Sequence, residues 1–115
     1  MARRLATVLG LVLIAIGIRG MVTGGSHVMK FGVSPAHNLI HVLSGAVALL
    51  TALGGERPAM IYCLAFGVVY GLVAVLGFFQ IHAVIDLLNL NMADNFLHLG
   101  ISAVCLVAGA LSKGK

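Results

Sequence analysis

The sequence is poor in charged side chains. Asp, Glu, Lys and Arg together make up 9% of its 115 residues, and only 3 of these are acidic. Hydrophobic residues make up 61%, and the mean hydropathy is +1.14. A water-soluble domain of this length could not hide so much apolar surface. We therefore expect one domain, residues 1–115, folded in a lipid bilayer.

Other scarcities exclude further classes of protein. The 2 cysteines, Cys63 and Cys105, lie inside apolar runs, which argues against a disulfide framework. The net charge of +4 is small, and the basic residues stand at the ends of apolar runs, so nucleic acid is not expected as a partner. Ser102 shares a helix face with His98 and Asp94, but without a nucleophile elbow, and we expect no enzyme.

Four apolar stretches are each close to the roughly 20 residues that cross a bilayer. They run from about Leu5 to Val22, Pro35 to Leu53, Ala59 to Phe79 and Met92 to Leu111. The first has no small-residue cleavage site before Arg19, so we expect it to stay as a span. The sequence thus predicts an all-α, polytopic membrane protein with four transmembrane helices.

The connection from Gln80 to Leu90 also has helical spacing. Its apolar residues are Ile81, Val84, Ile85 and Leu88, with His82, Asp86 and Asn89 on another face. This pattern favours a short helix in the outer membrane interface. The alternative is that the third long helix extends past Phe79, and both remain open.

The basic residues predict the orientation of the chain. One side of the membrane would carry Arg3, Arg4, Arg57, Lys113 and Lys115, and the other Arg19 and Lys30. Because cytoplasmic loops are enriched in Lys and Arg, both termini are expected to be cytoplasmic. All five histidines then fall on the outer half.

A polar box occurs twice in the chain, 57 positions apart. Ser34–His41 carries His37, Asn38 and His41, and Asn91–His98 carries Asp94, Asn95 and His98. Glycine, alanine and aliphatic positions match at the same offset without a gap. The pattern indicates tandem duplication of a two-helix unit, with halves of about 1–57 and 58–115 related by a pseudo-two-fold axis along the membrane normal.

Helix capping explains part of each box. Ser34 and Asn91 are good N-caps, and Asp94 favours the positive end of a helix dipole. His41 and His98 lie about 10 Å below the helix starts, at 1.5 Å per residue. Polar side chains at that depth are costly in lipid and mark function. We therefore expect them to face the bundle interior.

Three interpretations of the interior residues remain open. In the first, Asn38, Asn95, His41 and His98 form a structural hydrogen-bond network across the pseudo-two-fold axis. In the second, a zinc-like ion is bound by the side chains of His37, His41, Asp94 and His98. In the third, His41 and His98 ligate a haem iron or a chlorophyll magnesium from opposite sides. The sequence leaves the cofactor unknown.

Two packing expectations concern the third long helix. Gly67 and Gly71 form a GxxxG pair, which we assign to packing within the chain rather than to a dimer interface. Tyr70 lies deep in the same helix and requires a hydroxyl partner. Ser44 and Ser102 are both candidates.

The boxes resemble a bacterial family of small four-helix integral membrane proteins of unknown function. The residues that carry the resemblance are Val33–His41 with Gly45, then Phe66–Tyr70, then Leu90–Gly100. The resemblance implies four spans in the bacterial cytoplasmic (inner) membrane, and it supplies no reaction, ligand or partner. Ser102 and Cys105 depart from the Gly and aliphatic residues that the family favours.

Size, and the lack of a soluble or catalytic segment, favour a non-enzymatic protein that acts as an accessory or stabilising subunit of a larger membrane assembly. Its partners would be the lipid bilayer and other membrane subunits, or further copies of itself. The alternative is a metal- or tetrapyrrole-binding protein that uses the His/Asp cluster.

Overall fold

The computed structural model describes residues 1–23, 27–28, 31–32 and 34–112. Its elements follow the chain in the order α1 (Ala2–Thr23), β1 (His27–Val28), β2 (Phe31–Gly32), α2 (Pro35–Gly54), α3 (Glu56–Phe78), α4 (His82–Leu88) and α5 (Met92–Leu111). Four residues used in the orientation and resemblance arguments lie outside the described residues: Lys30, Val33, Lys113 and Lys115. The side chains of His27 and Phe31 also lie outside them.

Four of these helices, α1, α2, α3 and α5, are long and apolar enough to cross a membrane. This confirms the all-α, four-span fold class, and α2 and α5 begin at the residues predicted. β1 and β2 form a short antiparallel pair that the sequence did not indicate. The chain turns at Phe79 and Gln80 before α4 begins, so the alternative of a continuous third helix is wrong.

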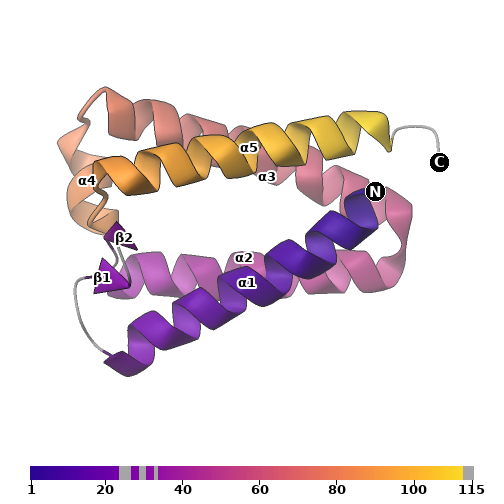
Figure 1. The fold of residues 1–115 in the computed structure, drawn as a ribbon, viewed down its shortest axis with the longest axis horizontal. Helices are drawn as coiled ribbons and strands as arrows, with labels where there is room; N and C mark the ends of the chain where they lie inside the picture. The colour runs from indigo at the N-terminus through magenta and orange to yellow at the C-terminus, as the bar shows by residue number, and fades with distance from the viewer. Residues whose placement is uncertain (24–26, 29–30, 33, 113–115) are drawn as a thin grey trace.

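The long helices pair in the order of the chain. α1 lies along α2, and α3 lies along α5 (Figure 1). The start of α1, the end of α5 and the α2–α3 connection gather at one end of the bundle, which we name the terminal end. β1, β2 and α4 lie at the opposite end, named the α4 end. The connection at the terminal end turns at Gly55, whose φ of 121° favours glycine.

Glycines bring the paired helices together. A Cβ atom added to Gly45 would lie 2.7 Å from the Gly10 carbonyl oxygen, and one added to Gly10 would lie 2.8 Å from the Gly45 oxygen. Gly67 and Gly71 contact side chains of α5, Leu106 and Ser102 respectively, which confirms their role in packing within the chain. Lipid gives helices no hydrophobic reason to associate, so close backbone contact has to hold the pairs.

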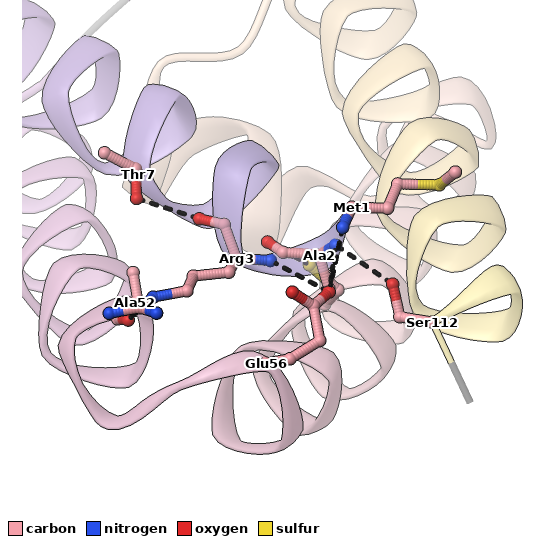
Figure 2. Close-up of polar contacts among 8 residues, drawn as sticks. Met1, Ala2, Arg3, Thr7, Ala52, Glu56 and Ser112 are labelled. Carbon is pink, nitrogen blue, oxygen red and sulfur yellow. Dashed lines mark hydrogen bonds and ion pairs between the residues drawn. The ribbon is translucent and has the colours of Figure 1, made fainter. Parts of the chain in front are cut away.

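A carboxylate joins the two pairs at the terminal end. Glu56 Oε1 accepts hydrogen bonds from the Met1 amine at 3.0 Å, Ala2 N at 2.7 Å and Arg3 N at 3.3 Å (Figure 2). Ala2 N also donates to Ser112 Oγ at 2.9 Å. The first residue of α3 therefore caps the start of α1, where negative charge complements the helix dipole.

The glycine contacts predict opposite results for two Gly→Ala changes. Gly45→Ala should lower the free energy of unfolding by about 1–3 kcal/mol, because the new methyl group meets backbone that cannot rotate away. Gly100 has no neighbour within 4 Å of an added Cβ. Gly100→Ala should therefore leave stability unchanged or raise it by up to about 1 kcal/mol. Unfolding in detergent measures both, and equal losses would contradict the close α1–α2 contact.

Candidate functional site

Ser34 fixes the start of α2. Its Oγ accepts a hydrogen bond from His37 N at 3.1 Å and donates to the Leu87 carbonyl at 2.8 Å. Pro35 follows at the first helical position, where its missing N–H costs nothing. The predicted N-cap is thus confirmed, and it also ties the start of α2 to the end of α4.

Asn91 and Asp94 form a reciprocal capping box at the start of α5. Asp94 N donates to Asn91 Oδ1, and Asn91 N donates to Asp94 Oδ2, both at 2.9 Å. Asp94 is buried, with 1% of its surface exposed. The carboxylate therefore serves the α5 helix end, as the capping argument expected.

Three histidines converge at the α4 end. His37 and His41 come from α2 and His98 from α5, and all three are buried, with 2–4% of their surface exposed. One ring nitrogen of each lies within 4.8 Å of the others. The ring centroids of His37 and His41 are 4.2 Å apart, and those of His37 and His98 are 5.6 Å apart.

The structure brings together three of the four predicted metal ligands. Asp94 is not in the group of three imidazoles, because its carboxylate belongs to the capping box. Three imidazole nitrogens are a complete set of protein ligands for a tetrahedral ion with one further position.

α4 orients His37. The His37 Nδ1 atom lies 2.9 Å from the Leu88 carbonyl oxygen. A carbonyl only accepts, so Nδ1 carries the proton and the lone pair of the neutral ring is on Nε2. α4 ends directly afterwards at Asn89, which adopts the left-handed conformation with φ 54°. Sequence reasoning did not assign this role to Leu88, and the stop signal at Asn89 was the one available clue.

His41, His98 and Tyr70 have polar atoms that the fold does not satisfy. Among the described residues, no hydrogen bond reaches the Nδ1 atoms of His41 and His98 or the Tyr70 hydroxyl, and all three atoms are buried. The Tyr70 ring lies against His98, with centroids 5.8 Å apart. Ser44, one of the two serines expected to pair with Tyr70, lines the same cavity as Tyr70.

Ser102, the other candidate partner for Tyr70, has a different role. Its hydroxyl donates to the Gly67 carbonyl oxygen and so joins α5 to α3. Ser44 contributes its backbone as well, since its carbonyl accepts from the Tyr62 hydroxyl at 3.1 Å. Neither serine therefore completes the hydrogen bond to Tyr70 that the sequence led us to expect.

The predicted network of asparagines and histidines does not form. Within the described part of the chain, no hydrogen bond joins Asn38 or Asn95 to the cluster. Asn38 packs against Gly20 of α1, and Asn95 packs against Gly77 of α3. Each amide oxygen fills the space that a Cβ atom would take if the facing glycine were replaced, and that glycine belongs to the same helix pair. This geometry suits weak Cα–H···O contacts.

A cavity of about 160 Å³ lies beside the cluster. Its lining comes from α2, α3, α4 and α5, and includes His37, His41, Ser44, Tyr70, Leu88 and His98. Its remaining wall is apolar. The Tyr70 hydroxyl and the imidazoles of His41 and His98 therefore border one cavity.

Residues 3–111 match the sequence profile of a family described as a domain of unknown function, DUF4383. The protein belongs to this family. No curated protein and no solved structure matches the chain.

The match spans all four long helices and confirms the resemblance drawn from the boxes, to small helical membrane proteins without an assigned role. Since the family brings no reaction or ligand, function has to be argued from the cluster itself.

The hydrogen bonds of the cluster predict a difference between two histidine variants in chelator. His37→Leu removes the donor to the buried Leu88 carbonyl and should cost about 1–3 kcal/mol of unfolding free energy. His41→Leu removes a ring whose Nδ1 has no partner among the described residues, and it should change stability by less than about 1 kcal/mol. Thermal unfolding of metal-free protein makes the comparison. If His41→Leu lost as much unfolding free energy as His37→Leu, the different hydrogen bonding assigned to the two rings would be contradicted.

Proposed function

We propose that this membrane protein binds a divalent transition metal ion through His37, His41 and His98. The observation that carries the proposal is the convergence of three buried imidazoles from two helices, with ring nitrogens within 4.8 Å of one another. The proposed role is binding, not catalysis.

A bound ion would account for the cost of burying the cluster. A polar atom left unpaired inside a protein costs about 1–3 kcal/mol, and the Nδ1 atoms of His41 and His98 both have no partner among the described residues. Polar side chains inside a membrane span are functional by default. Coordination would engage nitrogen lone pairs of His41 and His98, whose Nδ1 atoms accept no hydrogen bond among the described residues.

The surroundings of His37 fit a metal ligand. Metal-bound histidines generally donate their other ring N–H to a carboxylate or a backbone carbonyl, which fixes the tautomer. The Leu88 carbonyl does this for His37, at 2.9 Å. Ligands at about 2.1 Å from a tetrahedral ion lie about 3.4 Å apart. The ring nitrogens, which lie within 4.8 Å of one another, therefore have to close by up to about 1.4 Å on binding.

The ligand type narrows the class of ion. Imidazole suits zinc, copper, nickel and iron, whereas magnesium and calcium prefer oxygen ligands. With Asp94 occupied in the capping box, the ligand set is three imidazoles without a carboxylate. We therefore propose zinc or a neighbouring first-row ion.

A tetrapyrrole fits the site less well than an ion. The cavity holds about 160 Å³, below the roughly 300–1,000 Å³ of pockets for drug-sized ligands. His37 lies against both His41 and His98, which leaves no slot for a macrocycle between the latter two.

Zinc binding should depend on the cluster histidines alone. Calorimetric titration of metal-free protein in detergent should give one ion per chain. His98→Ala should weaken binding at least about 100-fold, since even outer-shell changes cost 10–100-fold. His82, exposed on α4, provides the control, and His82→Ala should bind as the wild type does.

The same ion should stabilise the fold. Zinc at 100 times its dissociation constant adds about 2.7 kcal/mol to the free energy of unfolding. A chelator should therefore lower the melting temperature of the wild type but not that of His98→Ala. Equal zinc affinity in the wild type and in His98→Ala would refute the proposed site.

A second proposal is an accessory subunit of a larger membrane assembly. It is favoured by the large apolar side chains that project from all four long helices, among them Val8, Leu50, Val68 and Val107. Lipid covers such faces equally well, so the observation is weaker than the cluster. Native mass spectrometry of gently solubilised protein should then show bound partner subunits or further copies. A monomer without partners would refute this role and leave the metal site unaffected.

We also infer the placement of the chain. Arg3, Arg4 and Arg57 lie near the terminal end and Arg19 near the α4 end, which supports a cytoplasmic-membrane protein with both termini inside. The histidine cluster would then face the outer half of the bilayer.

The tandem duplication, with halves 1–57 and 58–115, is likewise a proposal. Two matched contacts support it, since Gly20–Asn38 in the first half corresponds to Gly77–Asn95 in the second. The capping residues Ser34 and Asn91 correspond as well.

A further inference from the structure

We propose that the remaining position on the metal takes the oxygen atom of a small lipophilic phenol or alcohol, which enters from the bilayer between α2 and α3. This inference rests on the proposed metal site and names its ligand class. It is carried by the cavity beside the cluster and by the unpaired hydroxyl within it.

The size of the cavity limits the ligand. Its volume of about 160 Å³ equals about five water molecules at roughly 30 Å³ each. Apart from the three histidines, Ser44 and Tyr70, its lining is hydrophobic, with Phe66 and Val73 among the lining residues. A molecule with one ring and one polar head matches this space and this lining.

The cavity opens sideways rather than along the bundle axis. Leu88, the last residue of α4, is buried and lines the cavity at that end of the bundle. Ile40 of α2 and Val69 of α3 also line it, and they expose 41% and 50% of their surface on the outside of the bundle. In a four-span protein that outer surface faces hydrocarbon, so the path favours a ligand that dissolves in lipid.

Tyr70 is the polar group that selects an oxygen head. Its side chain lines the cavity with 4% of its surface exposed, and its hydroxyl has no hydrogen-bond partner among the described residues. Its ring stacks on His98 and so holds the hydroxyl beside a metal ligand. An oxygen atom bound to the metal can accept a hydrogen bond from the Tyr70 hydroxyl, which a hydrocarbon ligand cannot do.

Cobalt(II) and phenol test the inference in lipid nanodiscs. Cobalt in place of zinc gives a visible spectrum that responds to a new ligand. Phenol should shift the spectrum of the cobalt-loaded wild type and saturate. Tyr70→Phe should weaken phenol binding about three- to tenfold, the effect of one net hydrogen bond. Tyr62 does not line this cavity, so Tyr62→Phe should keep the wild-type affinity.

Access is tested by blocking the opening. Val69→Trp should abolish the phenol response while cobalt still binds. Val68→Trp is the matched control, because Val68 is 62% exposed on the neighbouring face and lines no part of this cavity. Cobalt uptake by each variant shows that the cluster has folded.

The outcomes separate the two proposals. If the wild type takes up no cobalt, the metal site is wrong and the ligand inference falls with it. If cobalt binds but phenol leaves the spectrum unchanged, only the ligand inference is overturned. It is also overturned if Val69→Trp and Val68→Trp respond to phenol equally, because access would then not run between α2 and α3.

Discussion

Polar groups in a lipid-facing protein have to find partners inside the chain, because hydrocarbon offers none. The starts of three of the described helices follow this constraint. Glu56 caps α1, Ser34 caps α2, and Asn91 with Asp94 caps α5. Against this background, the buried Nδ1 atoms of His41 and His98 stand out, because no hydrogen bond reaches them within the described part of the chain.

The corresponding positions of the two boxes differ in chemistry, and the difference produces the cluster. His37 in the first box aligns with Asp94 in the second. Asp94 turns back to its own helix end, as acidic residues at that position do. His37 instead reaches the Leu88 carbonyl, which α4 supplies. The site thus has two histidines from one half and one from the other.

Close packing at glycine accounts for the position of the cluster between the halves. Gly10 and Gly45 bring α1 and α2 together, and Gly67 and Gly71 bring α3 and α5 together. Each pair is therefore tight internally, and the asparagines fill the glycine notches within their own pair. The larger imidazoles and Tyr70 lie between the pairs, where the cavity also lies.

Local features of the sequence determined the spans, the caps and the buried stripes. Length and hydropathy fix where a helix crosses a membrane, and the order Ser-Pro or Asn-x-x-Asp fixes where it starts, because both signals act within a few residues. His37, His41 and His98 were predicted to face inward, because polar residues spaced along one helix face have no other low-cost position.

Only the tertiary structure decided which partner each residue meets. Leu88 contributes a carbonyl that every residue possesses, Glu56 caps a helix 54 positions away from it in the chain, and Asn38 contacts Gly20 instead of a histidine. Such contacts depend on how helices cross, and no single residue type marks them in advance.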